Sequence, residues 1–184
     1  QHVSSFNTYC RHAAEAARVE TGNSKLDAKW IAAKMVGRWH DGTSLVRNPN
    51  GRPDRAPDND FAFATEDPQG LQCPLGSHVR RSNPRDSLGA DPETQLKINN
   101  RHRILRCGRT YKSGQEAGLL FMCLNADIER QYEFMQQSWV SSSFFQGLTD
   151  EKDPTIGANE GTGSFSIPMS EGRLLLRDLP SFVT

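Results

Sequence analysis

A single histidine stands between a turn of small residues and a dense group of arginines. His78 follows a Cys-Pro-Leu-Gly-Ser segment, and three arginines come soon after it: Arg80, Arg81 and Arg85. A second arginine-rich segment spans 103–109 and mixes guanidinium groups with apolar residues. Haem suits this combination, because its iron takes an axial imidazole and its two propionates pair with cations. The pattern therefore predicts an anionic cofactor whose metal takes one nitrogen ligand.

Two helices and a long loop are predicted ahead of this histidine. Apolar residues at helical spacing indicate a helix over 6–19 and another over 24–34. The segment 41–74 is rich in Gly, Pro, Asn and Asp, which is typical of loops. A loop of this length in a compact domain often carries function or wraps another surface.

Antiparallel strands are predicted behind the histidine. Segments 104–111 and 118–124 have the composition of two strands joined as a hairpin. A helix should follow, with an inner face at helical spacing made of Ile128, Tyr132, Met135 and Trp139. A third strand is expected over 164–167, and a fourth should start at Phe182.

Helices laid on an antiparallel sheet make an α+β, ferredoxin-like fold. We expect two parts: amino-terminal helices with their long connecting loop over 1–72, and a haem-binding ferredoxin-like domain over 73–184. The sheet of the second part is expected to be incomplete at its carboxy-terminal end, because the sequence stops just after Phe182.

Three segments carry a resemblance to a known family. His78-Val-Arg-Arg-Ser-Asn-Pro-Arg-Asp resembles the proximal-histidine signature of dye-decolourising (DyP-type) haem peroxidases. Asn100-Arg-His-Arg-Ile-Leu-Arg-Cys-Gly resembles the segment that supplies the distal arginine of that family, and 118–131 resembles the strand and helix that follow. The match runs from about Val36 to Thr184, so the chain resembles the carboxy-terminal half of such an enzyme.

The resemblance implies a haem b cofactor and a peroxidase reaction. Hydrogen peroxide would be reduced, and an organic electron donor such as a dye or a phenol would be oxidised. His78 would be the proximal ligand of the metal. Arg106 would be the catalytic residue, because a fixed cation stabilises the negative charge that develops as the O–O bond splits.

Five further residues are implied to bind the cofactor, each with an ordinary alternative. Arg80, Arg81 and Arg85 would pair with the propionates. The alternative is that each guanidinium is simply solvated. Leu119 and Phe121 would line the distal cavity. The alternative is packing within the sheet, and both roles can hold because the two residues share one face of a strand.

Several ligand questions stay open at this point. A histidine ligand usually donates its second ring N–H to a carboxylate or carbonyl, and Asp150 and Asp153 are both candidates for that partner. Cys73 is an alternative thiolate ligand, because a Cys-Pro pair presents such a ligand in some haem-sensing proteins. His102 is the histidine to test next if His78 is not the ligand.

The family's distal acid is not found. Its GxxDG motif, which carries an aspartate, is absent, and the segment Gly37-Arg-Trp-His-Asp41-Gly42 has one residue too many before Asp41. Two alternatives to the peroxidase therefore remain: a non-catalytic haem-binding or haem-sensing module, and a structural fragment that binds no haem.

Composition excludes some classes of protein. The 184 residues carry 22 basic and 22 acidic side chains, so no excess of positive charge favours nucleic acid. No apolar run reaches the length of a membrane span, and no leader opens the sequence. The four cysteines are far apart without a CxxC pair, which disfavours a zinc site. They predict thiols in a reducing, cytoplasmic compartment rather than secretion, with two disulfides as the alternative.

An open sheet edge and an uncovered cofactor face would favour association with other chains. The isolated chain is therefore expected to form a homo-oligomer or to need a missing amino-terminal half.

Overall fold

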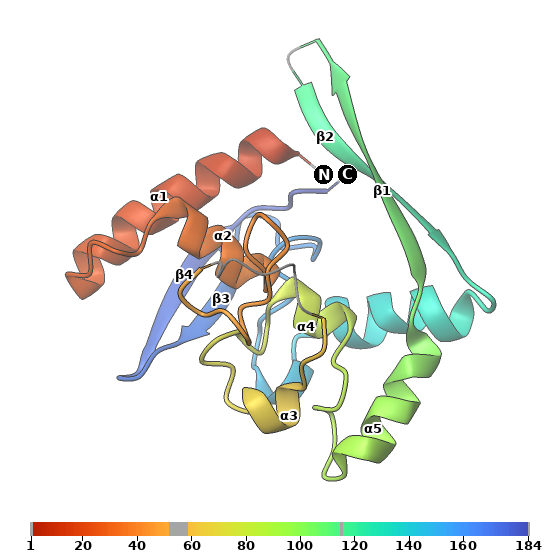
Figure 1. The fold of residues 1–184 in the computed structure, drawn as a ribbon. Coiled ribbons are helices and arrows are strands. Elements are labelled where there is room, and N and C mark those ends of the chain that lie inside the picture. Colours follow the sequence, from red (N-terminus) through yellow and green to blue (C-terminus); the bar gives the residue numbers. More distant parts are fainter. Residues whose placement is uncertain (1, 52–58, 115, 184) are drawn as a thin grey trace.

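Helices and short antiparallel strands make up the computed structural model, which describes residues 2–51, 59–114 and 116–183 (Figure 1). In chain order the elements are α1 (Val3–Thr21), α2 (Ala28–Val36), α3 (Phe63–Glu66), α4 (His78–Ser82), α5 (Pro92–Asn99), η1 (Asn100–His102), β1 (Leu105–Ser113), β2 (Glu116–Leu124), η2 (Glu129–Glu133), η3 (Met135–Val140), η4 (Phe145–Gly147), β3 (Gly163–Pro168) and β4 (Arg173–Leu179). The predicted loop over 41–74 contains only α3 in its described part, and 52–58 lies outside the described residues.

The largest core cluster joins α1 and α2 to the β3–β4 pair. Helix α1 contributes Cys10, Ala14 and Ala17, which follow helical spacing. The strands contribute buried apolar side chains that alternate along each strand. This core uses residues from both 1–72 and 73–184, the two parts that the sequence analysis predicts.

Helix α2 begins where a side chain caps it. Asp27 is the N-cap and accepts a hydrogen bond from the Trp30 N–H at 2.8 Å. The predicted start at residue 24 is therefore four residues too early, whereas the predicted end at 34 lies within two residues of Val36. The predicted helix over 6–19 lies wholly within α1.

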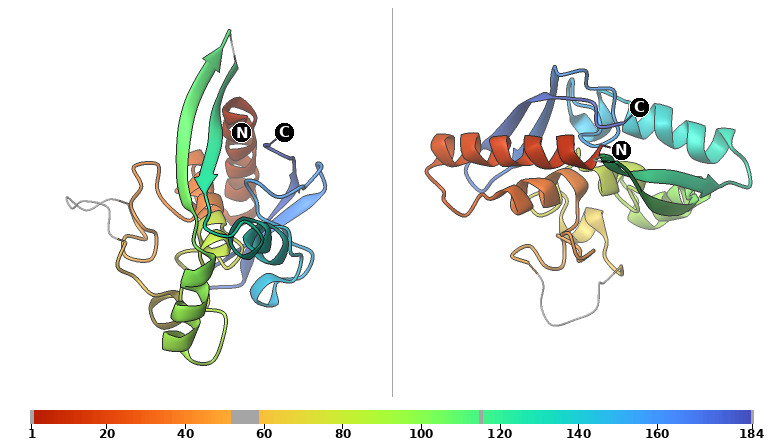
Figure 2. Two further views of the ribbon diagram at one scale, coloured as in Figure 1. Left: turned by 90° about the vertical axis from the view of Figure 1, so that its right-hand side faces the viewer. Right: turned by 90° about the horizontal axis from the view of Figure 1, so that it is seen from above.

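Strands β1 and β2 form a ribbon that extends away from the rest of the chain (Figures 1 and 2). The predicted hairpin is confirmed, with Leu105 opposite Leu124 at one end and Ser113 opposite Glu116 at the other. The two residues of the first pair are 70 % and 72 % exposed, although both are leucines. The ribbon thus leaves apolar side chains uncovered, although Gly118 on β2 also forms a β-bridge with His2.

The strands form two separate antiparallel pairs, β1–β2 and β3–β4. The α+β class is confirmed, but the single sheet expected from the sequence is divided in two. Strand β4 was not predicted, and the strand expected from Phe182 is wrong for the described residues, which are irregular after β4. The Phe182 carbonyl instead accepts the His2 N–H at 2.8 Å, and the last expected strand residue, Thr184, lies outside the described residues.

The segment after β2 winds as two π-helical stretches, η2 and η3. Its predicted inner face is confirmed for Met135 and Trp139, which are buried, and Tyr132 packs partly against them. Ile128 is 56 % exposed, so it does not belong to that face. A helical pattern of period 3.6 assigns the wrong face near its start when the backbone is wound more widely.

The end of α2 lies against the turn before α4, and Gly37 makes this possible. Its backbone is left-handed (φ 93°), and a Cβ there would lie 3.0 Å from Ser77 Oγ and 3.1 Å from both Cys73 Sγ and Val79 Cβ. Only glycine combines this conformation with so close an approach. Helix α2 thereby supports the turn that presents His78.

Gly37→Ala should destabilise the protein by about 2–3 kcal/mol, because it adds crowding to the cost of the left-handed backbone. Gly22→Ala is the matched control: it also has positive φ (69°), but nothing lies within 4 Å of its Cβ position. Denaturant unfolding should show a loss of only about 1 kcal/mol for the control. Equal losses in the two variants would show that the contact with the turn contributes nothing.

Candidate functional site

The predicted ligand His78 is held by a buried carboxylate. It is the first residue of α4, and its Nδ1–H donates to Asp153 Oδ2 at 2.9 Å. The Asp153 side chain is 0 % exposed, whereas that of His78 is 28 % exposed. Of the two candidates left open by the sequence, the structure therefore selects Asp153. This hydrogen bond leaves Nε2 as the ring nitrogen for a metal.

The second carboxylate oxygen of Asp153 is fixed as well. Oδ1 accepts from Thr155 N at 2.8 Å, from Thr155 Oγ1 at 2.8 Å and from Ile156 N at 2.9 Å. Burial acts to raise the pKa of Asp153, but the charge and hydrogen bond of His78 and the two backbone donors hold it below its usual value. Burial acts to lower the pKa of His78, and the Asp153 carboxylate outweighs it, so this pKa lies above its usual value. An ionised Asp153 fixes both the orientation and the tautomer of the imidazole.

The register of the ribbon brings three predicted residues to one face. Arg106 lies opposite Cys123, Phe121 lies opposite Gly108, and Leu119 lies opposite Thr110. Cross-strand partners share a face and alternate residues share a face, so Arg106, Leu119 and Phe121 all point to the same side. Phe121 is 47 % exposed, so it is not packed away within the sheet.

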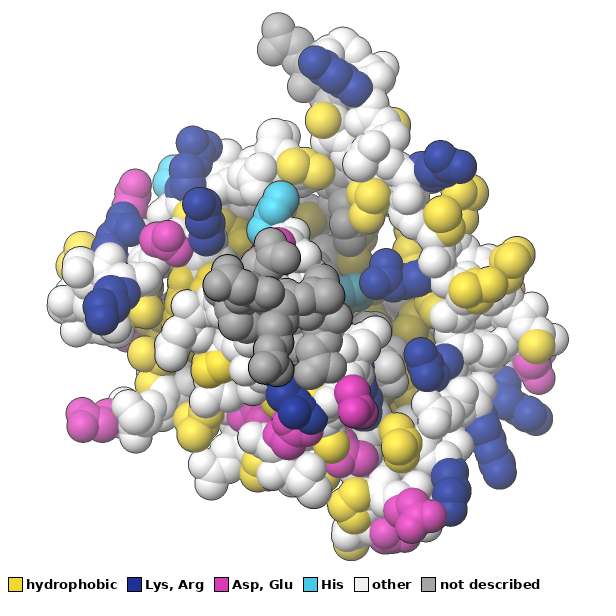
Figure 3. Space-filling model, in the orientation of Figure 1, with side chains coloured by type: hydrophobic (Ala, Val, Ile, Leu, Met, Phe, Trp, Pro, Cys, Tyr) yellow, Lys and Arg dark blue, Asp and Glu magenta, His cyan; other side chains and the backbone are white. Residues whose placement is uncertain are grey.

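This face of the ribbon lies near His78. The charge of Arg106 acts to lower the pKa of His78, which places the guanidinium within electrostatic range of the imidazole. Figure 3 shows basic side chains beside a hollow at the base of the ribbon.

Arg85 presents a buried donor without a partner. Its Nη1 donates to the carbonyls of Asn59 and Phe61, at 2.8 and 2.9 Å, and its guanidinium lies 3.8 Å from the centre of the Phe61 ring. Its Nε is buried and has no hydrogen-bond partner among the described residues. Burial and the charges of Arg38 and Arg103 lower the pKa of Arg85. An anionic group beside Arg85 would satisfy the free donor and relieve this repulsion.

Arg80 and Arg81 were predicted to hold propionates, but the structure places both inside the protein. They are 1 % and 0 % exposed. Arg80 donates to the carbonyls of Asp67 and Cys73 and lies 4.6 Å from the centre of the Phe63 ring. Arg81 likewise donates to backbone carbonyls. Both guanidinium groups are thus buried and bonded to carbonyls of the chain, so neither belongs to the proposed cofactor site.

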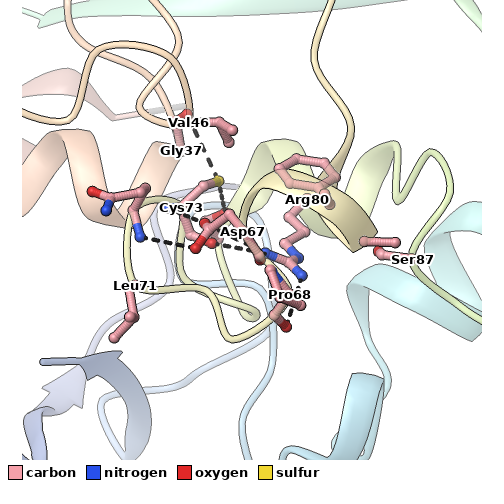
Figure 4. A network of polar contacts seen from close by, with 12 residues as sticks. Gly37, Val46, Asp67, Pro68, Leu71, Cys73, Arg80 and Ser87 are labelled. Carbon is pink, nitrogen blue, oxygen red and sulfur yellow. Dashed lines mark hydrogen bonds and ion pairs between the residues drawn. The ribbon is translucent and has the colours of Figure 1, made fainter. Parts of the chain in front are cut away.

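A polar network around Asp67 supports the turn before α4 (Figure 4). Asp67 accepts from Cys73 N at 2.7 Å and Gln72 N at 3.2 Å, and its Oδ2 lies 3.6 Å from Arg80 Nη1. The Cys73 thiol is buried 3.0 Å from Ser77 Oγ, and burial raises its pKa to about 11. Cys73 is thus a neutral thiol at pH 7, which disfavours a thiolate ligand at this position. Sequence reasoning missed Asp67, because an acid in a loop usually lies at the surface.

Asp41 and His102 both have structural roles. Asp41, the residue compared with the aspartate of the GxxDG motif, is exposed and accepts the Thr43 N–H at 2.9 Å in a turn. His102 pairs through Nδ1 with the Arg130 carbonyl at 2.6 Å, and its ring stacks on Phe134 at 4.0 Å.

The donor set fits a metal that brings its own ligands. No group of three or more His, Cys, Asp or Glu side chains that could hold an ion occurs in the described part of the chain. An imidazole with a free Nε2 can bind a metal whose other ligands a cofactor supplies, and a cation such as Arg85 can pair with an anionic group. All four cysteines are free thiols, so the two disulfides considered from the sequence are not observed. Within the described ranges, no helix combines the length and the apolar character that crossing a bilayer requires.

Known proteins with the same motifs provide a comparison. No family model matches the chain. The multifunctional dye peroxidase DyP2 of Amycolatopsis is 32 % identical over 154 residues, which cover 75 % of this chain and 32 % of that protein. Peroxidase 2 of Mycetinis scorodonius is 28 % identical over 194 residues, which cover 90 % of this chain and 35 % of that protein.

Solved structures agree with these relatives. A DyP-type peroxidase from Anabaena has a TM-score of 0.79 at 27 % identity, over 98 % of this chain and 40 % of that one. A fungal DyP-type peroxidase from Auricularia auricula-judae has a TM-score of 0.77 at 27 % identity, over 98 % of this chain and 45 % of that one.

Helices packed on antiparallel strands define an α+β protein, and the predicted ferredoxin-like class is confirmed. The chain belongs to the DyP-type peroxidase family. It spans about a third of the length of the curated relatives it matches, for example 32 % and 35 %.

Proposed function

We propose that this chain binds haem b through His78 and is the carboxy-terminal, haem-binding half of a peroxidase. That peroxidase would reduce hydrogen peroxide and oxidise organic donors such as dyes and phenols. The observation that carries this proposal is the hydrogen bond between His78 and Asp153, which leaves Nε2 as the ring nitrogen for a metal. The four free thiols support the proposal of a reducing compartment.

Each residue of the site has a role that follows from its placement. Haem, when bound, supplies an iron centre at which the O–O bond of peroxide is reduced. His78 would bind the metal through Nε2, and the Asp153 carboxylate would increase the basicity of that nitrogen by accepting the Nδ1 proton. Arg106 would stabilise the negative charge on the departing oxygen. Leu119 and Phe121 would exclude water from the same face.

Arg85 would hold the anionic edge of the cofactor. Its Nε is buried and has no hydrogen-bond partner in the described ranges, and its Nη1 is fixed by the two carbonyls of 59 and 61. A carboxylate there would gain a charge-assisted hydrogen bond and neutralise a crowded cation.

A non-catalytic haem-binding or haem-sensing module is the second candidate, and one observation favours it. The ribbon residues 105–113 and 117–124 include no Asp or Glu, so the face that carries Arg106 presents no acid to move peroxide protons. Reconstitution with haem b separates the candidates. A Soret band with dye turnover supports the peroxidase, and a Soret band without turnover supports the module. Absence of a Soret band would contradict both.

Asp153→Asn should weaken haem binding about 10–100-fold, because an amide oxygen is a poorer partner for the imidazole N–H than a carboxylate. The measurement is a haem titration followed by absorbance. Asp150→Asn is the matched control, since Asp150 is exposed and has a left-handed backbone (φ 59°) that Asn also tolerates. A loss of affinity in the control that equals the loss in the variant would contradict the selection of Asp153.

A further inference from the structure

The Arg81 guanidinium joins three separate segments of the chain. Its Nε donates to the Gly76 carbonyl at 3.1 Å, and its Nη1 donates to the carbonyls of Trp139 and Ser142 at 2.8 and 2.9 Å. Its Nη2 donates to the Glu151 carbonyl at 2.6 Å. One side chain therefore fixes the turn before α4, the end of η3 and the loop after η4.

The contact between Arg81 and the Glu151 carbonyl lies close to Asp153, the hydrogen-bond partner of His78. Glu151 is two residues before Asp153, whose own N–H donates to the Val140 carbonyl at 3.0 Å. The Glu151 side chain is anchored in turn, because it accepts from Ser166 N at 2.9 Å and from Ser166 Oγ at 2.5 Å on β3. The loop that carries Asp153 is thus held at its backbone by Arg81 and at its side chain by β3.

Arg81 and His78 also belong to one short helix. They are three residues apart in α4, so they project from the same side of it. Helix α4 therefore carries both the imidazole of His78 and the guanidinium that binds the loop containing Asp153. We propose that Arg81 is a positioning residue that sets the hydrogen bond between His78 and Asp153; the functional meaning of that bond rests on the proposed ligand role of His78.

Arginine is suited to this position in a way that lysine is not. A planar guanidinium has five N–H donors in a fixed geometry, whereas an ammonium is a single centre. Four carbonyls from three segments surround Arg81, and its guanidinium lies 5.0 Å from the centre of the Phe145 ring. Burial lowers the pKa of Arg81 to about 10, so the group stays a cation at pH 7. A lysine would leave buried carbonyls without donors.

Arg80 offers a matched control one residue away. It is as deeply buried in the same helix, but its hydrogen bonds go to Asp67, Pro68, Cys73 and Gln146. Lysine at either position removes a buried guanidinium from α4. Only at position 81 does the change release the loop that carries Asp153.

The test is the Nδ1–H proton signal of His78, observed by NMR in the haem-free chain labelled with ¹⁵N-histidine and assigned from its absence in His78→Gln. We expect Arg81→Lys to shift this signal upfield or to abolish it through exchange with water, and Arg80→Lys to leave it in place. An unchanged signal in folded Arg81→Lys, or equal changes in the two variants, would overturn the proposal. A general loss of stability would move both variants alike.

Phe145→Leu is the second variant, in case Arg81→Lys does not fold. It keeps an apolar side chain but removes the ring that packs on the guanidinium, so that Arg81 is held less firmly against its four carbonyls. An upfield shift in the same direction supports the proposal, and an unchanged signal contradicts it.

After haem loading, the proposal also predicts a lower Fe–His stretching frequency in ferrous Arg81→Lys than in ferrous Arg80→Lys. If the wild-type chain shows no Soret band, the proposed function fails. The NMR comparison still decides the role of Arg81, because it needs no haem.

Discussion

His78→Ala should abolish stoichiometric haem binding, which is the largest effect expected for this chain. No second imidazole in the described residues is held by a buried carboxylate, and Asp153 would be left as an unpaired buried charge. Titration of the variant with haem b should give no saturable Soret band under conditions in which the wild-type chain binds one equivalent.

His102→Ala is the control for this result. Its imidazole stacks on Phe134 and pairs with a carbonyl, so its loss should leave the Soret band in place. An unchanged Soret band in His78→Ala would remove the ligand assignment, and loss of the band in His102→Ala alone would transfer that role to His102.

Arg106→Leu should leave haem bound but slow the reaction with peroxide by a factor on the order of 10²–10³. The leucine retains apolar bulk on the ribbon face, but it offers no charge to the departing oxygen. Stopped-flow absorbance in the Soret region, after mixing with hydrogen peroxide, measures this rate directly.

Arg109→Leu is the matched control on the same strand. Arg109 lies opposite Leu120, three residues from Arg106, so it points to the opposite face of the ribbon. Its loss removes the same charge from the same element and should leave the peroxide rate within about twofold of the wild-type value. Equal rates for wild type and Arg106→Leu would place Arg106 outside the reaction.

The local sequence pattern was sufficient to predict an element where residues close in sequence determine its structure. Helices α1 and α2 and the β1–β2 hairpin follow from apolar spacing and turn residues, because each is closed by hydrogen bonds between residues close in sequence. The face shared by Leu119 and Phe121 follows from the period of a strand, whereas the register between β1 and β2 adds Arg106 to it. The motif around His78 indicates a ligand because it combines a histidine with several cations. Strand β4 buries Leu174 and Leu176, but Leu175 between them is also apolar, so the sequence shows no alternation there.

Tertiary structure decided the partners of these residues. Asp150 and Asp153 are equivalent in sequence, and only packing shows that the second meets His78, from which it is 75 positions away. Arg80, Arg81 and Arg85 share one motif, yet Arg80 and Arg81 are buried among carbonyls, whereas Arg85 keeps a donor with no partner in the part of the chain that the structure describes. The sequence by itself therefore determined which residues can do the chemistry and the elements that carry them. The fold alone decided which side chains reach the site, because a side chain's partners are set by segments distant in sequence that pack around it.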